Sequence, residues 1–433
     1  MVIQTMYEFI DNINKEEYEN FILSCPYNHF MQSYDFGQIR KYKHFIPHYV
    51  GLKKDGKLVC AALLLEKKLK LGYTYFYSPR GYILDYNNLD LIEAFTNELK
   101  KYAKKNKAIF IKMDPAIKRH NLDQDGNIID DNNNYKLINY LKKLGYKHQG
   151  YNIGFEHEQP RFTFRISLDG SWDEIYSRIH PTSRKILNKG NQYNLEIYKG
   201  NTHKDLEDFY DTMIETSKRE GIIQSPIDYY ETFFNIFNYD NLRDLYIVKV
   251  KMSTLINSFE NKIKNVENEI ETINSRGNSK NDNKVNDLVN QLNKLNKDLE
   301  EIKEIKDDEL ILSSIITVKY GDKVWTVHGG NNSKLLNLNA NYLCYFEIMK
   351  DAYNEGYKVM DCFGTCGIPN PDKSNPIFGI HSFKKRLGGE YTEFIGEFDL
   401  VTNKFMYFIF KKLIPIRRRI VRSILRRKEK RVD

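Results

Sequence analysis

The sequence predicts an α/β protein with two domains of similar construction and a long helical arm inserted in the second domain. The chain has 433 residues, of which 41% are apolar, so it is long enough for two or three packed domains. β-like and helical segments alternate along it, and one region carries apolar residues at coiled-coil spacing. We expect the domains at residues 1–165 and 166–400, the arm at 253–308 and a C-terminal tail at 401–433.

The first domain contains a strand, a turn, a helix and a second strand in close succession. Residues 73–86 form a β-like segment that contains a Pro-Arg-Gly turn. Residues 89–107 have the apolar periodicity of an amphipathic helix, and residues 108–115 form an apolar run that ends in Asp114. The order of these elements predicts a parallel strand pair joined by a helix.

A second stretch repeats this order. Residues 323–333 lead to a Gly-Gly turn, residues 341–356 predict a helix, and residues 357–364 predict a strand ending in Asp361. The distance from the turn to the final Asp is 33 residues in the first unit and 32 in the second. A duplicated domain explains this match, although such units are common enough for a chance similarity to stay open.

The arm is predicted from two series of apolar residues that step by three and four positions. The series are Ile256, Phe259, Ile263, Val266, Ile270 and Ile273, then Val285, Leu288, Leu292, Leu295, Leu299 and Ile302. The polar stretch 275–283 between them contains Gly and several Asn, which break helices. We therefore expect an antiparallel coiled-coil hairpin, and a parallel dimerisation coiled coil is the less favoured alternative.

Charge is concentrated at the C-terminus. The whole chain carries 66 − 58 = +8, whereas residues 411–433 carry eleven Lys or Arg against two acids, or +9, which leaves −1 for the rest. Apolar residues of this tail share one helical face (Ile416, Ile420, Val421, Ile424 and Leu425). A basic amphipathic helix of this kind binds an anionic membrane surface, and tRNA is the competing partner.

The cysteines, the N-terminal residues and the absence of known motifs limit the cellular location and the chemistry that the sequence allows. Five cysteines without a disulfide or zinc spacing indicate a reducing compartment, and the N-terminal residues lack a signal sequence. We expect a cytoplasmic protein, with the tail as a candidate for peripheral attachment to the inner face of the membrane. Walker, Rossmann, zinc-protease and serine-hydrolase motifs are absent, and Cys362 and Cys366 have the wrong spacing for a redox or metal motif. We expect no metal and no cofactor.

Several segments together resemble the FemABX family of peptidoglycan aminoacyltransferases. They are QSYDF (32–36), YFYSPRGYILDY, IKMDP, HPTSRKILNKG (180–190), ETSKREGI (215–222), DYY (228–230), HGGNNS and the block FKK…IGEFD. The resemblance covers nearly the whole chain and implies two acetyltransferase-like (GNAT-like) domains with a coiled-coil arm in the second. It implies transfer of an amino acid from aminoacyl-tRNA to the stem peptide of a cell-wall precursor.

The resemblance also implies catalytic residues. Lys384, preceded by Phe383, matches the family's catalytic-site lysine, a cation that would stabilise the oxyanion or the departing ribose oxygen. We expect it in a surface cleft; without the resemblance, it is one more solvated lysine of a KKR run. Asp114 and Glu397 match acidic positions and are candidates for the base, or else structural carboxylates at strand ends.

For the acceptor, Arg40 resembles a phosphate-binding cation, with Lys41 as the alternative or solvent exposure as the simpler explanation. Tyr229 and Tyr230 resemble tyrosines that pack on the substrate. The chain departs from the family in two places near this site. Gln224 and Ser225 stand where the family often has an Arg, and His328 stands where it often has an aromatic residue, so the diphosphate would be held differently.

For the donor, the diphosphate-binding hexapeptide of acetyltransferases is absent, which argues against coenzyme A and is consistent with the aminoacyl-tRNA that the resemblance implies. Four cations are candidates to bind the tRNA, or form an ordinary solvated helix face: Arg178, Arg184, Lys185 and Lys189. We expect transfer of Gly, Ala or Ser to lipid II, or to the soluble UDP-MurNAc-pentapeptide, to build the interpeptide bridge. Aminoacylation of protein N-termini and a non-enzymatic membrane or RNA adaptor are the alternatives. The oligomeric state stays open.

Overall fold

The computed structural model describes residues 7–156, 158–190, 193–238, 241–275 and 282–413. Its first sheet has the strand order β1-β2-β3-β4-β6-β17-β9, with β5 paired to β3. The strands are β1 (Glu8–Ile10), β2 (Ile46–Lys54), β3 (Lys57–Lys68), β4 (Thr74–Ser78), β5 (Ile83–Leu84), β6 (Ala108–Met113), β9 (Tyr146–His148) and β17 (Phe398–Val401). Its helices are α1 (Lys15–Ser24), α2 (Tyr34–Arg40), α3 (Leu89–Lys105) and α4 (Tyr135–Lys143), and a small hairpin is formed by β7 (His120–Leu122) and β8 (Ile128–Asn133).

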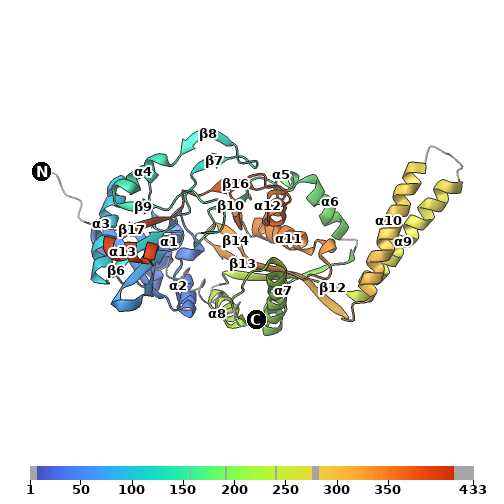
Figure 1. The fold of residues 1–433 in the computed structure, drawn as a ribbon, viewed down its shortest axis with the longest axis horizontal. Helices are drawn as coiled ribbons and strands as arrows, with labels where there is room; N and C mark the ends of the chain where they lie inside the picture. The colour runs from blue at the N-terminus through green and yellow to red at the C-terminus, as the bar shows by residue number, and fades with distance from the viewer. Residues whose placement is uncertain (1–6, 157, 191–192, 239–240, 276–281, 414–433) are drawn as a thin grey trace, which may run out of the picture.

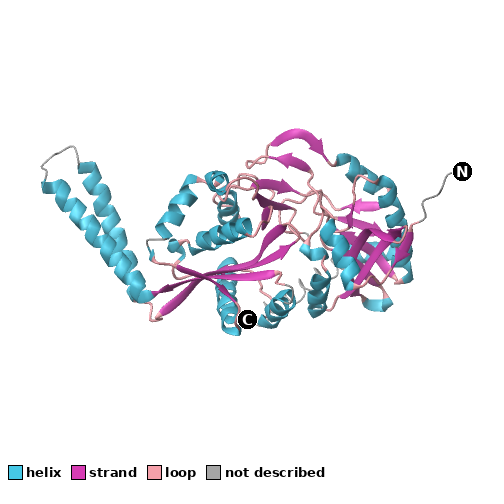
Figure 2. Ribbon diagram, turned by 180° about the vertical axis from the view of Figure 1, so that it is seen from behind, coloured by secondary structure: helices cyan, strands magenta, loops and turns pink. Residues whose placement is uncertain are grey.

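The second sheet has the order β11-β12-β13-β14-β15-β10-β16. Its strands are β10 (Phe162–Ser167), β11 (Glu196–Gly200), β12 (Arg243–Lys251), β13 (Glu309–Tyr320), β14 (Lys323–Asn331), β15 (Val359–Thr365) and β16 (Glu390–Glu393). Around it lie α5 (Trp172–Arg178), α6 (Pro181–Gly190), α7 (His203–Glu220), α8 (Ile227–Asn238), α11 (Ala340–Asn354) and α12 (Phe378–Lys385). Figure 2 shows helices on both faces of this sheet, which is the layering of a mixed α/β fold.

Both predicted strand-helix-strand units are confirmed. β4 runs parallel to β6 with α3 between them in the chain, and β14 runs parallel to β15 with α11 between them. Helix α3 begins where the Asn88 side chain accepts a hydrogen bond from the Leu91 N–H at 3.0 Å, and its apolar face is buried on the first sheet. Asp114 directly follows β6, as expected. The expectation for Asp361 is wrong, because β15 continues to Thr365 and Asp361 lies within it.

Two long helices, α9 (Met252–Ser275) and α10 (Asp282–Lys303), lie side by side and project from the second sheet between β12 and β13 (Figure 1). Away from the sheet they contact one another through apolar residues of the predicted series, among them Val266, Ile273 and Leu288. Near the sheet, Phe259 and Ile302 belong to the core of the second sheet itself. The base of the arm is therefore part of that core.

The chain returns to the first sheet near its C-terminal end. β17 pairs with both β6 and β9, and α13 (Lys404–Phe408) and η7 (Ile409–Leu413) follow it on the same side of the molecule. The expected division at residues 165 and 400 makes each domain one continuous stretch of chain, whereas the first sheet also takes one strand from residues beyond 397. Pairing between such distant segments leaves no local trace in the sequence.

An apolar core joins the two sheets. It contains Phe30 and Tyr49 from the first part of the chain together with Phe233 and Trp325 from the second. Among the described residues, no helix is both long enough and apolar enough to cross a membrane. The tail predicted from Ile416 onward lies outside the described residues.

Candidate functional site

The first group of predicted residues surrounds the Pro-Arg-Gly turn after β4. Asp114 is buried, and its two carboxylate oxygens accept hydrogen bonds from the Arg80 N–H at 2.7 Å and the Tyr77 hydroxyl at 2.9 Å. Burial raises the pKa of Asp114, and the Arg80 guanidinium opposes this rise. Because both oxygens are occupied, the geometry favours Asp114 as a residue that positions the turn.

Glu397 lines a cavity of about 10 Å³ together with Asp114. It is buried and forms an ion pair with Lys112, while its second oxygen accepts the Glu158 N–H at 3.4 Å. Burial lowers the pKa of Lys112, whereas the carboxylate of Asp399, 3.6 Å from its Nζ, acts to raise it. The structure thus brings both predicted acids to one place and pairs one of them with a lysine.

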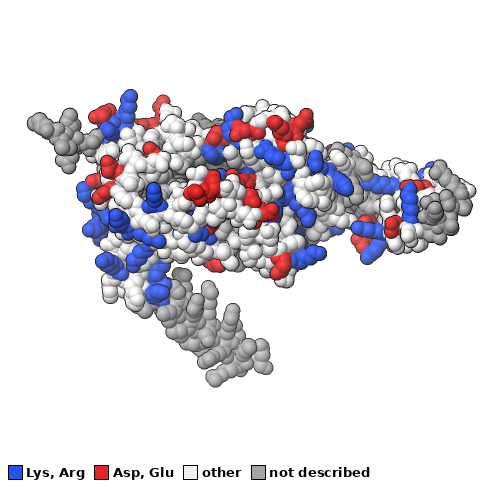
Figure 3. All heavy atoms as spheres, turned by 90° about the horizontal axis from the view of Figure 1, so that it is seen from above, with Lys and Arg blue, Asp and Glu red and all other residues white. Residues whose placement is uncertain are grey.

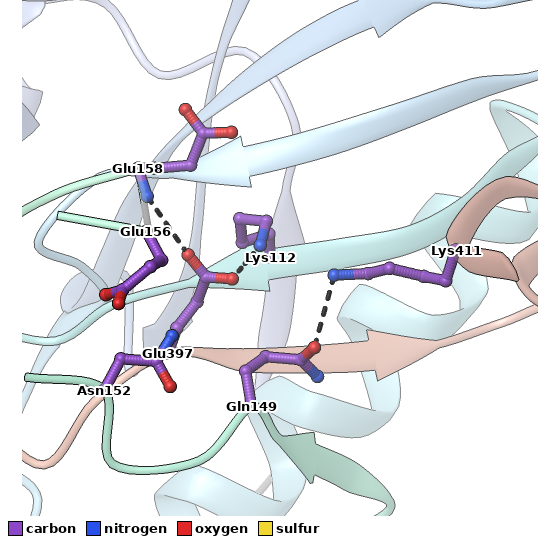
Figure 4. Close-up of a pocket in the computed structure, with 7 residues that line it drawn as sticks. All are labelled: Lys112, Gln149, Asn152, Glu156, Glu158, Glu397 and Lys411. Atoms are coloured by element: carbon purple, nitrogen blue, oxygen red, sulfur yellow. Dashed lines mark hydrogen bonds and ion pairs between the residues drawn. The ribbon is translucent and has the colours of Figure 1, made fainter. Parts of the chain in front are cut away.

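A larger polar pocket of about 310 Å³ opens beside Glu397 (Figure 4). Its lining residues are Lys112, Gln149, Asn152, Glu156, Glu158, Glu397 and Lys411. Lys411, from η7, donates to Gln149 at 3.2 Å and is paired with Asp399 at 2.9 Å. The lining thus combines three carboxylates with two lysines, and one of these lysines is already paired with Glu397.

Sequence reasoning missed Lys112 and Lys411. Lys112 left a signal, because it is the lysine within the otherwise apolar strand β6 and is 7% exposed. A charged residue at such a position is almost never buried unless it is paired. Lys411 left no such signal, since it belongs to a tail rich in lysine and arginine.

Lys384 lies at the end of α12 and is 4% exposed, so the expectation of a surface-cleft lysine is wrong. Its Nζ donates to the carbonyl oxygens of Gly364 at 2.7 Å and Phe363 at 3.3 Å, both at the end of β15. Burial lowers its pKa to about 8. The neighbouring Lys385 is the one that turns outward, where it pairs with Asp125 at 2.6 Å.

Phe383 packs its ring edge-on against Tyr342 and Tyr345, with ring centroids 4.6 and 4.8 Å apart. This contact fixes the last turn of α12 on α11 and thereby the direction of the Lys384 side chain. Phe363, whose carbonyl Lys384 binds, has a φ of 59°. Such a backbone conformation is uncommon outside glycine and occurs often at functional sites.

The loop residue Pro160 contacts both Arg80, which binds Asp114, and Gly364, which binds Lys384. The Pro160 carbonyl accepts a hydrogen bond from the Arg80 guanidinium at 2.7 Å. The Pro160 ring contacts Gly364 so closely that a Cβ at that position would lie 2.3 Å from it. Neither cavity described above is lined by Lys384.

A second group of predicted residues meets between the two sheets. Arg40 is half-buried, and its guanidinium lies over the rings of Phe45 at 4.9 Å and Phe36 at 5.9 Å. Lys41, the alternative to Arg40, is exposed at the end of α2. Tyr229, from α8 beneath the second sheet, forms an edge contact with Tyr42 from the first part of the chain.

Tyr230 and His328 complete this group. The Tyr230 hydroxyl donates to Gln224 at 2.9 Å, and the His328 ring lies 5.2 Å from the Tyr230 ring. Burial, followed by the nearby Lys43 ammonium, lowers the pKa of His328 to about 4. Its buried Nε2 has no hydrogen-bond partner in the described part of the chain. The His328 imidazole is therefore neutral at pH 7, and one of its ring nitrogens is buried without a partner among the described residues.

Lys43 is the residue of this group that sequence reasoning missed. Its Nζ lies 3.2 Å from Ser225 Oγ and 4.7 Å from the centre of the Tyr229 ring. Burial and the Arg40 guanidinium lower its pKa. The lysine thus occupies the neighbourhood of residues 224 and 225, where the sequence lacks an expected arginine.

The cations predicted to bind tRNA lie on α5 and α6. Arg178 is exposed, donates to the Ser167 carbonyl at 2.7 Å and lines a pocket of about 480 Å³. Arg184 lies 5.8 Å from the Tyr176 ring, and Lys185 is exposed. The side chain of Lys189 lies outside the described residues.

Comparison with known proteins places these features in a family. The model of the FemAB family matches residues 13–413. A lipid II:glycine glycyltransferase of Staphylococcus haemolyticus is 26% identical, covering 93% of this chain and 95% of its own, and one of Staphylococcus aureus strain MRSA252 is 27% identical with the same coverage. The crystal structure of FemX superimposes with a TM-score of 0.73 at 25% identity, covering 93% of this chain and 99% of that one.

Proposed function

Since this chain belongs to the FemAB family and is an aminoacyltransferase, we propose that it transfers glycine to lipid II during synthesis of the peptidoglycan interpeptide bridge. The observation that carries this proposal is the similarity, over 93% of the chain, to relatives named for that reaction. The FemX structure supports it with the same mixed α/β fold. Two GNAT-like domains and a coiled-coil arm are the architecture that we infer for this fold.

Glycyl-tRNA is the donor in this proposal. The coenzyme A motif is absent from the sequence, and exposed Arg178 and Lys185 supply positive charge for an RNA backbone. Lipid II presents a diphosphate, for which Arg40 and Lys43 are the proposed partners, with Tyr229 and His328 packing beside it. Lys43 then compensates for the arginine that residues 224 and 225 lack. The tail would hold the enzyme at the inner face of the membrane, where lipid II is available.

Chemically, the acceptor amine attacks the carbonyl carbon of the aminoacyl ester. A C–N bond forms, the bond from the carbonyl carbon to the ribose oxygen breaks, the amine loses a proton and the ribose oxygen gains one. Lys384 uses two of its three N–H donors on backbone carbonyls, which leaves one for the oxyanion or the ribose oxygen. Glu397 is engaged by Lys112 and the Glu158 N–H. Asp114 is likewise engaged by Tyr77 and Arg80, so neither acid is assigned as the group that accepts the proton from the amine.

The test is to incubate the protein with [¹⁴C]glycyl-tRNA and one of two acceptors, lipid II in vesicles or a protein with a free N-terminus. Label on lipid II alone supports the proposal. Label on the protein acceptor would instead support N-terminal aminoacylation. Transfer to neither acceptor, with retained binding of tRNA or vesicles, would support an adaptor.

A further inference from the structure

Three large apolar side chains of the first sheet and its C-terminal helix are exposed to water. Leu71 is 86% exposed, Phe405 72% and Phe408 55%. Leu71 lies at the tip of the connection between β3 and β4, and the two phenylalanines are three residues apart on α13, which places them on one face of that helix. Isolated exposed apolar residues are ordinary, whereas a group of large ones marks an interaction surface.

The inner sides of both segments are anchored in one apolar cluster. Leu69 and Tyr73, on either side of Leu71, pack against the same buried residues as Met406 and Phe410. At the centre of this cluster the Phe110 ring meets the Tyr407 ring at 5.5 Å. The exposed side chains are therefore held outward by a packed base.

The charged residues next to these side chains in the sequence are all lysines. Lys68 and Lys70 precede Leu71, and Lys404 and Lys412 flank the two phenylalanines, all four exposed. Neither segment, 67–75 or 402–413, contains an Asp or a Glu. Figure 3 shows Lys and Arg side chains gathered at this end of the molecule. Apolar tips surrounded by lysines complement an anionic lipid surface, because the tips enter the boundary of headgroups and acyl chains while the lysines meet phosphates.

We propose that Leu71, Phe405 and Phe408, with the lysines beside them, form a membrane-docking face that inserts into an anionic bilayer. This face is built from the connection between β3 and β4 and from the described first part of the predicted tail, residues 401–413, and it does not include residues 414–433. It would fix the orientation of the enzyme, whereas a basic tail alone would fix only its distance from the membrane.

The docking face is continuous with the proposed diphosphate site. Lys67, at the end of β3, lies 4.6 Å from the centre of the Phe45 ring, and the Arg40 guanidinium lies over the same ring at 4.9 Å. Lys67 is four residues from Leu71, at most about 13 Å of extended chain. Docking would thus bring the diphosphate site to the depth of lipid phosphates, a consequence that rests on the proposed function, whereas the docking itself does not.

The experiment measures binding of the full-length protein to vesicles of phosphatidylglycerol and phosphatidylcholine by co-sedimentation, without tRNA or precursor. The variant is Leu71→Ser/Phe405→Ser/Phe408→Ser. The control is Ile128→Ser/Ile129→Ser on β8, where the isoleucines are 59% and 61% exposed but lie next to Asp130 and Asp131. Because neither variant touches the proposed catalytic residues, failure of the transferase proposal would leave this result unaffected.

In 1 M NaCl, where charge interactions are screened within about 3 Å, we expect the triple variant to bind about 100-fold more weakly than the wild type. The control should bind within about twofold of the wild type. Equal binding by the triple variant, or an equal loss in the control, would overturn the proposal. Circular dichroism and thermal unfolding verify that both variants are folded.

A fluorescent reporter separates the other possible occupants of the face. Emission from a Phe405→Trp variant should shift to shorter wavelength on addition of vesicles, whereas an Ile129→Trp variant should not respond. An emission shift without vesicles that depends on protein concentration would point to a second copy of the chain on this face. An emission shift without vesicles that disappears when residues 414–433 are removed would point to the tail. Either result would contradict docking on lipid.

Discussion

Replacement of Lys384 by methionine should separate stability from activity. Burial holds the pKa of Lys384 at about 8 rather than the ordinary 10.5, which corresponds to a cost of about 3 kcal/mol for keeping the charged form folded. Methionine removes this cost, but it leaves two carbonyl oxygens without their donor, at about 1–3 kcal/mol. We therefore expect the free energy of unfolding at pH 7 to stay within about 2 kcal/mol of the wild type.

The free energies of unfolding of the wild type and the methionine variant should also depend differently on pH. Between pH 8 and 10.5 the unfolded wild type keeps the lysine proton that the folded protein has released, so its stability rises with pH in this range. The methionine variant lacks this contribution. Urea unfolding at pH 7 and pH 9.5 measures both effects, with Lys385→Met as the control, since Lys385 faces solvent.

The transfer activity should fall strongly in the Lys384→Met variant, although its stability changes little. If the Lys384 ammonium donates to the oxyanion or the ribose oxygen, its removal lowers turnover by about 100-fold or more. Turnover by the wild type should also fall as the pH rises past about 8, and the variant should lack this fall. Near-normal turnover, or an alkaline fall that persists in the variant, would refute this role for Lys384.

Three further predictions concern the acceptor, the arm and the tail. Lys43→Met should raise the KM for lipid II about tenfold with little change in kcat, while the control Lys57→Met, at an exposed lysine, should change neither constant. Steady-state kinetics measures both constants, and the same KM in the two variants would contradict a contact between Lys43 and a phosphate. Replacing residues 264–294 by a short Gly/Ser linker should leave the unfolding midpoint nearly unchanged, because the core residues at the base of the arm remain. If the arm docks tRNA, filter binding should show a weaker affinity for tRNA, and an unchanged affinity would exclude that role. Removing residues 414–433, which carry 9 − 2 = +7, should lower transfer to lipid II in anionic vesicles while sparing a soluble acceptor, and equal losses on both would contradict a membrane role.

The sequence was most informative where a pattern is local. The 3,4 stepping of apolar residues predicts helices over 256–302, and the structure has α9 and α10 there, because one helix face must be buried whatever the rest of the chain does. The strand-helix-strand units were equally clear. Strand β17 could not be predicted in this way, because its four residues pair with a segment about 290 positions earlier in the chain.

For the site, the structure shows where the predicted residues lie, whereas their roles in binding and catalysis stay predictions. The sequence indicated one binding site with six members: Arg40, its alternative Lys41, Tyr229, Tyr230, Gln224 and His328. The structure places five of them between the sheets and leaves Lys41 exposed. Sequence reasoning misjudged the exposure of Lys384, because a run of two lysines and an arginine is typical of a solvated surface. Neighbouring residues on a helix point about 100° apart, so one lysine of such a run can be buried while the next faces water.

The return of the chain to the first sheet bears on how the protein folds during synthesis. β9 joins the first sheet only through β17, which separates it from β6. The ribosome must therefore add 401 − 148 = 253 residues after β9 before that edge of the sheet can close. At about 5–20 residues per second this takes roughly 13–50 s. During that time the β6 edge is unpaired, which makes it a binding site for a chaperone or a point of aggregation for the nascent chain.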